Sequence, residues 1–272
     1  MSQKICFVGA GNMAASLIGG LIANGYEHGS ITACDIDREQ LQRLEEYFEI
    51  NTSGDNLASA QDADLVILAV KPQIMRDVCL GLAGLPHNPE QLFISIAAGV
   101  PTGAIDAWLG GGRALVRCMP NTPALMQLGA TGLFANPKVG EKQQLAARQI
   151  LDAVGICLWV TEESALDAVT AISGSGPAYF FYFIECLEEA GVKLGLPRDI
   201  AGRLARQTAF GAASMAREDD VVALRAQVTS EKGTTEQAIL SFQANRLDRL
   251  VTEAATAANR RAQELAQELG AV

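Results

Sequence analysis

Small residues follow the first apolar run of the chain and open a helical pattern, an arrangement that suits a phosphate group. Gly9 permits a tight turn, Gly11 lets the backbone approach a pyrophosphate closely, and Ala14 lets helix and strand pack. Unpaired N–H groups at the helix start attract the phosphate. The alternative interpretation of the same residues is a plain turn between a strand and a helix, without a ligand. The pattern favours a dinucleotide site made of Gly9, Ala10, Gly11, Asn12, Met13 and Ala14.

Two charged residues after the second apolar run bear on the choice of coenzyme. Asp35 stands where an acid hydrogen-bonds the adenosine ribose 2′-OH and disfavours a 2′-phosphate. Arg38 follows within reach and is placed to accommodate that phosphate, unless it is an ordinary surface residue of the first helical turn. Asp35 therefore favours NADH, whereas Arg38 favours NADPH. The sequence does not decide between the two coenzymes.

Three further apolar runs end in residues that suit a ligand, and ligands of open α/β sheets lie outside such carboxyl ends. Lys71 either faces a ligand or only marks the exit of the chain to solvent. Ala97 lies among small residues that suit either close approach to a ligand or tight packing. Asn121 stands between two prolines, where it either holds a nicotinamide carboxamide or belongs to a stiff turn.

A cluster of hydroxyl side chains precedes a helical stretch at Glu236–Gln243. Ser230, Thr234 and Thr235 supply hydroxyls, and Gly233 exposes backbone, at the start of that helix. Hydroxyls and free N–H groups at a helix N-terminus form a cradle for a carboxylate. Ordinary capping residues are the equally strong alternative.

The elements that must position these residues differ between the two parts of the chain. The apolar runs predicted as strands are Ile5–Val8, Ile31–Cys34, Leu65–Val70, Leu92–Ile96, Ala114–Cys118 and Ile156–Val160. Helices are predicted near residues 13–24, 38–48, 73–83, 101–109 and 141–153. This alternation predicts an α/β, doubly wound, Rossmann-like dinucleotide-binding domain over residues 1–161.

Strand patterns disappear after Glu162, which predicts an all-α domain over residues 162–272. Residues 245–268 carry one apolar stripe at helical spacing. Tyr179–Ile184 is apolar on all sides, and a helix without a polar face must be covered all round. Burial against a second subunit is favoured over a central helix in a monomeric bundle, so the domain is expected to form a homodimer.

Composition excludes several classes of partner. The net charge of −10 makes nucleic acid an unsuitable partner. Six scattered cysteines and only two histidines, His28 and His87, predict no metal site. The start of the chain lacks a signal-peptide pattern, and no apolar run is long enough to span a membrane. A cytoplasmic protein without membrane partners is expected.

Five sequence blocks together resemble the pyrroline-5-carboxylate reductases, and the match covers essentially the whole chain. They are Gly9–Ala14, Ala69–Pro72, Arg117–Pro123, Ser173–Tyr179 and Val228–Thr235. The resemblance implies reduction of the imine of pyrroline-5-carboxylate to L-proline with NADPH or NADH, the last step of proline biosynthesis. It also implies dimers through the helical domain, which in many members assemble further into decamers.

The resemblance also assigns roles to particular residues. Ser230, Gly233, Thr234 and Thr235 match the loop that holds the substrate carboxylate, and Thr235 matches the residue proposed to donate to the ring nitrogen. The usual loop is Ser-Pro-Gly-Gly-Thr-Thr, whereas Glu231 and Lys232 stand here for the proline and first glycine. The cofactor contacts that it implies are Gly9–Ala14, Asn56, Ala69, Val70, Lys71, Pro72, Ala97 and Asn121.

The chemistry does not require a histidine. Hydroxy-acid dehydrogenases commonly use one as proton donor, but an imine nitrogen can arrive already protonated. The nicotinamide would then transfer a hydride to the imine carbon while Thr235 hydrogen-bonds the nitrogen. Lys71 would position the nicotinamide side of the coenzyme, so that correct orientation alone is enough for catalysis. A β-hydroxyacid dehydrogenase would need a lysine where Phe180 stands. Two alternatives remain: an imine reductase with a different range of substrates, and a cofactor-binding regulator that catalyses no reaction.

Overall fold

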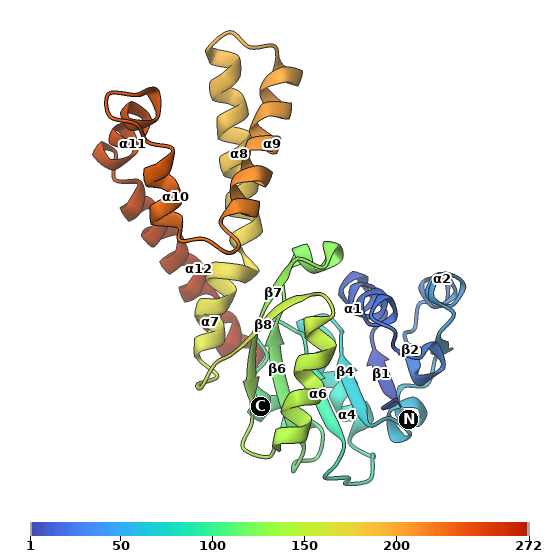
Figure 1. Cartoon of the computed structure of the whole chain (residues 1–272). Coiled ribbons are helices and arrows are strands. Elements are labelled where there is room, and N and C mark those ends of the chain that lie inside the picture. Colours follow the sequence, from blue (N-terminus) through green and yellow to red (C-terminus); the bar gives the residue numbers. More distant parts are fainter. Residues whose placement is uncertain (1, 271–272) are drawn as a thin grey trace. The chain divides into compact units, whose positions relative to one another are not determined.

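The computed structural model describes residues 2–270 and divides into two compact units (Figure 1). Among the described residues, the first unit comprises 2–175 and 258–270, whereas the second is Gly176–Ala257. The predicted boundary after residue 161 lies ahead of the division at Ser175. The reason is that the helix following residue 164 packs on the sheet of the first unit.

An eight-stranded sheet forms the centre of the first unit, in the order β3-β2-β1-β4-β5-β6-β7-β8. All neighbouring strands are parallel except β6 and β7, which are antiparallel. The strands are β1 (Ile5–Val8), β2 (Ile31–Cys34), β3 (Asn51–Ser53), β4 (Leu65–Leu68), β5 (Leu92–Ser95), β6 (Ala114–Met119), β7 (Gly129–Ala135) and β8 (Gly155–Trp159).

Helices cover both faces of this sheet, as in a doubly wound fold. Alternate residues of β1 face opposite sides: Phe7 belongs to the core beneath α1, α2 and α6, and Cys6 to the core beneath α3, α4 and α5. The α-helices are α1 (Asn12–Ala23), α2 (Arg38–Phe48), α3 (Asn56–Gln61), α4 (Met75–Leu82), α5 (Thr102–Trp108), α6 (Glu141–Asp152) and α7 (Ala165–Val169). Short 3-10 segments are η1 (His28–Ser30), η2 (Pro72–Ile74) and η3 (Thr122–Met126), and η4 (Thr170–Gly174) is a π-helix.

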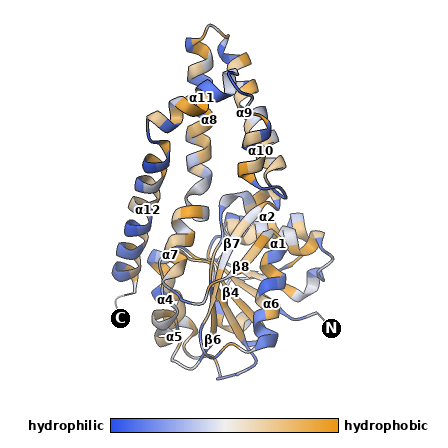
Figure 2. Cartoon of the chain, turned by 60° about the vertical axis from the view of Figure 1, so that its left-hand side comes forward, coloured by the Kyte–Doolittle hydropathy of each residue, from blue (hydrophilic) through white to orange (hydrophobic). Residues whose placement is uncertain are grey.

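The second unit is entirely helical over its described residues. Its helices are α8 (Gly176–Lys193), α9 (Arg198–Met215), α10 (Val221–Gln227), α11 (Thr234–Ala244) and the first part of α12 (Leu247–Leu269). The last turns of α12 belong to the first unit, where Leu265 and Leu269 lie against Gly99. Figure 2 shows hydrophobic colours along the strands and hydrophilic stretches along α6 and α12. No helix within residues 2–270 has the length and apolar character to cross a lipid bilayer.

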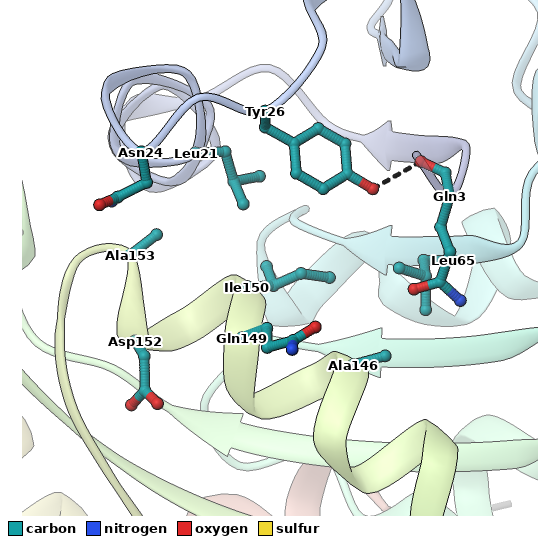
Figure 3. Close-up of a pocket in the computed structure, with 10 residues that line it drawn as sticks. All are labelled: Gln3, Leu21, Asn24, Tyr26, Leu65, Ala146, Gln149, Ile150, Asp152 and Ala153. Atoms are coloured by element: carbon teal, nitrogen blue, oxygen red, sulfur yellow. Dashed lines mark hydrogen bonds between the residues drawn. The ribbon is translucent and has the colours of Figure 1, made fainter. Parts of the chain in front are cut away.

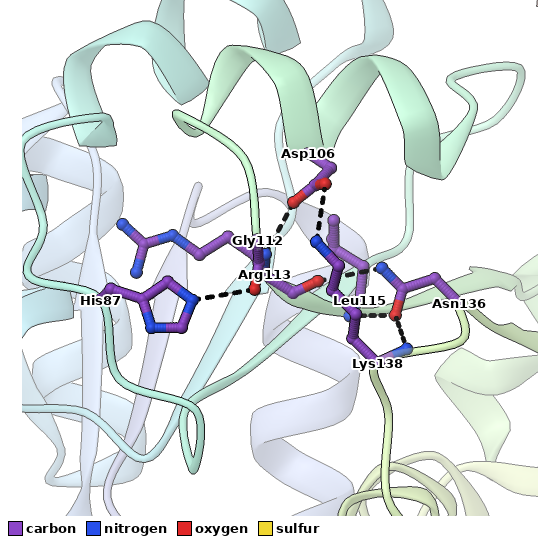
Figure 4. A network of polar contacts seen from close by, with 7 residues as sticks. All are labelled: His87, Asp106, Gly112, Arg113, Leu115, Asn136 and Lys138. Atoms are coloured by element: carbon purple, nitrogen blue, oxygen red, sulfur yellow. Dashed lines mark hydrogen bonds and ion pairs between the residues drawn. The ribbon is translucent and has the colours of Figure 1, made fainter.

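A polar network holds the start of β6, at the opposite end of that strand from the predicted ligand side (Figure 4). Arg113 is buried and donates to the carbonyl oxygens of Leu85 and Pro86 at 2.7 and 2.9 Å. Its backbone N–H donates to Asp106 Oδ1 at 2.7 Å. The other members of the network are His87, Gly112, Leu115, Asn136 and Lys138. These contacts give the network a structural role.

The predicted α/β fold with a helical second part is confirmed. Every predicted strand is present, with ends displaced by no more than two residues. Three elements had no sequence prediction: β3, β7 and α3. β7 contains two glycines and two alanines, which have weak strand preference, and β3 is a short polar edge strand.

Candidate functional site

Gly9 turns the chain sharply at the end of β1. Its φ is +104°, and a Cβ there would lie 2.7 Å from the carbonyl oxygen of Ala69. Its N–H donates to the carbonyl oxygen of Cys34 at 2.8 Å. The turn therefore fits between β2 and β4 only with glycine at this position.

The start of α1 is open and has no capping side chain. Gly11 is its N-cap, no side chain caps the helix, and its first turn holds no acidic residue. A Cβ added to Gly11 would meet nothing within 4 Å. The N–H groups of the first turn are thus left for an outside partner at the positive end of the helix dipole. These features fit the pyrophosphate of a dinucleotide.

Ala10, in the middle of the glycine turn, is held on both sides by residues after β2. Asp35 Oδ2 accepts from the Ala10 N–H at 2.8 Å, and Gln40 Nε2 donates to the Ala10 carbonyl oxygen at 2.9 Å. Asp35 Oδ1 also accepts from the N–H of Asp37 at 3.0 Å. Asp35 therefore shapes the turn, and its predicted ribose contact stays a prediction. Gln40 was not anticipated, because only the tertiary fold brings it to Ala10.

The other predicted cofactor residues also lie at or near carboxyl ends of strands. Ala69 and Val70 follow β4 and are half-buried, Lys71 is exposed, and Pro72 begins η2. Ala97 follows β5 and is buried. Because β1, β4 and β5 are neighbouring parallel strands, these segments lie beside the glycine turn at the carboxyl ends of the central strands. On the other side, Asn56 begins α3 and lines an open groove of about 620 Å³ that also includes Ile74 and Asp77.

Asn121 joins three segments of the first unit. Its Nδ2 donates to the carbonyl oxygen of Ser173 in the π-helix at 2.9 Å, and its Oδ1 accepts from the N–H of Ala130 at 2.9 Å. These bonds give the side chain a structural role at the start of β7. A contact with the nicotinamide carboxamide stays a prediction.

An ion pair between a buried arginine and a half-buried glutamate ties the segment before α7 to the sheet. Arg117 on β6 is 4% exposed, and its Nη1 lies 3.2 Å from Glu163 Oε1. The same carboxylate accepts from the N–H and hydroxyl of Thr102 at 2.7 and 2.8 Å, at the start of α5. This pair was not predicted from the sequence. Its signal in the sequence is Arg117, a charged residue within the apolar run of β6, because a buried charge needs a partner.

Asp167 adds a second carboxylate to this cluster. It is 7% exposed, and burial raises its pKa, while nearby Arg117 lowers it and Glu163 raises it further. One guanidinium therefore balances a buried acid, Asp167, and a half-buried one, Glu163. The segment that leads into the second unit is held on the sheet by this cluster together with Asn121.

The predicted substrate loop lies in the second unit, between α10 and α11. The N–H of Gly233 donates to the carbonyl oxygen of Ser230 at 3.0 Å, and a Cβ on Gly233 would collide with the Ser230 side chain. Lys232 takes a left-handed φ of 61°, and its N–H donates to Glu236 Oε2 at 2.8 Å. A tight turn therefore forms even though Glu231 and Lys232 replace the usual proline and glycine.

The hydroxyls of this loop are not used for capping. α11 begins after Gly233 without any side-chain cap. Ser230, Thr234 and Thr235 form no side-chain hydrogen bond with other described residues, whereas the hydroxyls of Ser214 and Thr229 donate to the carbonyl four residues earlier. The loop hydroxyls therefore cap nothing, whereas Glu236 in the first turn of α11 makes a contact of the capping-box kind with the Lys232 N–H. The loop presents free hydroxyls beside the unpaired N–H groups of a helix start, an arrangement that can bind a carboxylate.

A separate cavity of about 380 Å³ lies between the end of α1 and α6 (Figure 3). It includes Gln3, just before β1, and Leu65, the first residue of β4. The hydroxyl of Tyr26 donates to the Gln3 carbonyl oxygen at 2.5 Å, and desolvation raises the pKa of Tyr26 to about 12. The cavity lies at the amino ends of the strands, so it is distinct from the glycine turn.

Two family models match the chain. Residues 163–265 match "Pyrroline-5-carboxylate reductase dimerisation", and residues 4–99 match "NADP oxidoreductase coenzyme F420-dependent". The first match corresponds to the helical part and the second to the strands and helices around the glycine turn. Both therefore agree with the observed fold.

Curated and solved relatives match over nearly the full length. A pyrroline-5-carboxylate reductase of Pseudomonas aeruginosa is 53% identical, over 99% of each chain. The structure of one from Coxiella burnetii is 44% identical, with a TM-score of 0.94 over 97% of this chain and 99% of that one. The Plasmodium falciparum enzyme, solved with NADP bound, is 29% identical, with a TM-score of 0.82 over 97% and 98%. The chain therefore belongs to the pyrroline-5-carboxylate reductase family.

Proposed function

We propose that this chain reduces the C=N bond of 1-pyrroline-5-carboxylate to give L-proline, with NADPH or NADH as reductant. The observation that carries the proposal is that one chain of this family holds both an uncapped glycine turn and a loop of free hydroxyls. The turn suits the pyrophosphate and the loop suits a carboxylate, and the reaction requires both ligands.

The first unit would hold the coenzyme, which supplies a hydride when bound. Gly9–Ala14 would contact the pyrophosphate through backbone N–H groups. Lys71, exposed after β4, would position the nicotinamide side, and Ala97 would allow close approach on the neighbouring strand. The predicted contacts of Asn56 and Asn121 with the coenzyme belong to the same proposal.

The second unit would hold the imine. Ser230, Gly233 and Thr234 would bind the carboxylate through hydroxyls and the N–H groups of the first turn of α11. The Thr235 hydroxyl would then hydrogen-bond the ring nitrogen, its oxygen accepting from the N–H of the protonated imine, and orient the C=N carbon toward the hydride. No histidine takes part, because protonated imine nitrogen needs no strong acid. The loop comes from the same chain or from a partner copy.

Both nicotinamide coenzymes remain candidates, and Arg38 would contact the 2′-phosphate of NADPH. The oxygens of Asp35 each accept a backbone N–H, which partly offsets the repulsion of that phosphate. We expect Arg38→Ala to raise the KM for NADPH about tenfold, the loss of one charged hydrogen bond, and to leave the KM for NADH within about twofold. Arg43→Ala on the same helix is the control. Equal effects on both coenzymes would contradict the role of Arg38.

The chain would work as a homodimer joined through the helical unit, in the cytoplasm. Five consecutive aromatic residues of α8, Tyr179–Phe183, are each 38–70% exposed. Exposed aromatic residues on all sides of one helix suit burial against a second copy. Whether dimers assemble further into decamers can be measured by light scattering.

Steady-state assays test the proposed reaction directly. We expect NADPH and NADH to be oxidised when 1-pyrroline-5-carboxylate is added to the purified chain, with proline formed in equal amount. Coenzyme binding without oxidation would favour a non-catalytic regulator. Turnover of other cyclic imines, without turnover of 1-pyrroline-5-carboxylate, would favour an imine reductase with a different range of substrates.

A further inference from the structure

Two consecutive peptide groups of the glycine turn are held by side chains from outside the turn. The first joins Gly9 to Ala10, and its N–H donates to Asp35 Oδ2 at 2.8 Å. The second joins Ala10 to Gly11, and its carbonyl oxygen accepts from Gln40 Nε2 at 2.9 Å. Ala10 has no exposed surface, and among the described residues Gln40 is the only donor to this carbonyl. The second peptide group therefore depends on Gln40 for its hydrogen bond.

The bond from Gln40 also sets the direction of the Gly11 N–H. In a planar trans peptide the carbonyl and the N–H of the same group point in opposite directions, and residues 2–270 contain no cis peptide bond. With the Ala10 carbonyl turned toward Gln40, the Gly11 N–H is turned away from it. That N–H has no acceptor within the described part of the chain. It is therefore available to an outside acceptor at the start of α1.

Packing around Gly11 does not hold this peptide in place. A Cβ added to Gly11 would meet nothing within 4 Å, so the backbone there borders open space. Glycine lies on both sides of Ala10 and lacks the Cβ that restricts backbone rotation. The hydrogen bond from Gln40 is thus the contact that keeps the peptide from turning.

Gln40 is itself anchored by the start of α2. It is the third residue of that helix and is half-buried, and its backbone N–H donates to the capping carboxylate of Asp37 at 3.2 Å. A capped helix start therefore fixes a side chain that reaches a turn 30 residues earlier in the chain.

We propose that Gln40 is a positioning residue for the coenzyme pyrophosphate, because it keeps the Gly11 N–H directed at the phosphate oxygens. The inference rests on the proposed function, since it requires a dinucleotide at the glycine turn. Gln40 acts through Ala10 and needs no contact with the coenzyme. The pyrophosphate is common to NADPH and NADH, so Gln40 affects both equally, in contrast with Arg38.

Gln40→Met tests this role, because methionine has a similar length and no hydrogen to donate. The Kd values of NADPH and NADH, measured by titration calorimetry, are each expected to rise about fivefold, the size of one neutral hydrogen bond. ADP-ribose carries the pyrophosphate and should lose the same factor. Adenosine carries no phosphate and should bind within about twofold of wild type, and kcat at saturating coenzyme should also stay within about twofold.

Three further variants separate this role from a general effect on α2. Gln42→Met is the control on the same helix, because Gln42 Nε2 donates to Glu46 at the surface, and it should bind both coenzymes as wild type does. Gln40→Lys keeps a donor that can reach the carbonyl, so it should restore most of the affinity for ADP-ribose at about 0.5 M salt, where its added charge is screened. Gln40→Asn is one methylene too short, and it replaces Gln40→Met with the same expectation if the latter does not fold.

Wild-type affinity for both coenzymes in Gln40→Met, or an equal loss of adenosine and ADP-ribose, would overturn the inference. Coenzyme binding by the wild type without reduction of 1-pyrroline-5-carboxylate would overturn the proposed reaction and leave the role of Gln40 standing. Absence of coenzyme binding by the wild type would overturn both.

Discussion

Replacing Thr235 by alanine is expected to reduce kcat by about 10- to 100-fold, equivalent to roughly 1.4–2.7 kcal/mol of transition-state stabilisation. Thr235 is the second residue of α11 and is half-buried, and its hydroxyl has no hydrogen-bond partner among the described residues. The free hydroxyl would hydrogen-bond the imine nitrogen, accepting from its N–H, and without it the C=N bond would lose its orientation. Single-turnover measurements of coenzyme oxidation with saturating substrate report this step.

Two variants separate this role from a general effect on the helical unit. Thr235→Ser keeps the hydroxyl and should stay within about threefold of wild type, which is under 1 kcal/mol. Ser214→Ala removes a hydroxyl that only donates to the Phe210 carbonyl oxygen, so kcat should not change. Wild-type turnover in Thr235→Ala would show that the assigned role is wrong.

Replacing Arg117 by methionine is expected to lower the free energy of unfolding by about 3 kcal/mol. Arg117 is almost fully buried, and it balances Glu163 and Asp167. Without the guanidinium, two acids face each other with no cation. A loss of this size corresponds to a fall in Tm of roughly 6–12 °C, measurable by thermal unfolding.

The stability lost in Arg117→Met should be larger at neutral pH than at acidic pH. Burial raises the pKa of Asp167 in the folded chain above its unfolded value, and Arg117 opposes that rise. Without Arg117 the pKa rises further, so the ionised form costs more stability. That cost is present at neutral pH and shrinks as the pH falls through the raised pKa toward about 4, the range of unperturbed carboxyls.

Arg148→Met is the matched control for the Arg117–Glu163 pair. Arg148 forms an exposed i,i+4 pair with Asp152, in which the side chains are 54% and 42% exposed. Such pairs contribute about 0.3–0.5 kcal/mol, so the control should unfold close to wild type. A loss in Arg117→Met that is equally small, or that does not change with pH, would contradict the role of the buried cluster.

Local patterns predicted six of the eight strands of the first unit, because buried parallel strands are continuous apolar runs. Ile5–Val8 and Ile31–Cys34 are strands as predicted, and the glycine turn follows β1 as expected. β7 was missed because its glycines and alanines make a weak strand signal, and its place depends on pairing with both β6 and β8. The domain boundary after residue 161 stays a prediction; the compact units divide at Ser175 because α7 packs on β6 and β7.

Within the candidate site, the sequence by itself determined the residue types: the glycines of the turn, the hydroxyls of the loop and the lysine after β4. Only the tertiary structure decided how those groups are engaged. The oxygens of Asp35 accept from backbone N–H groups, and the side chain of Asn121 bonds to the backbone of Ser173 and Ala130. The loop hydroxyls, by contrast, have no such partner. The physical reason is that a hydrogen bond depends on distance and direction between atoms far apart in the chain, which spacing along a sequence does not specify.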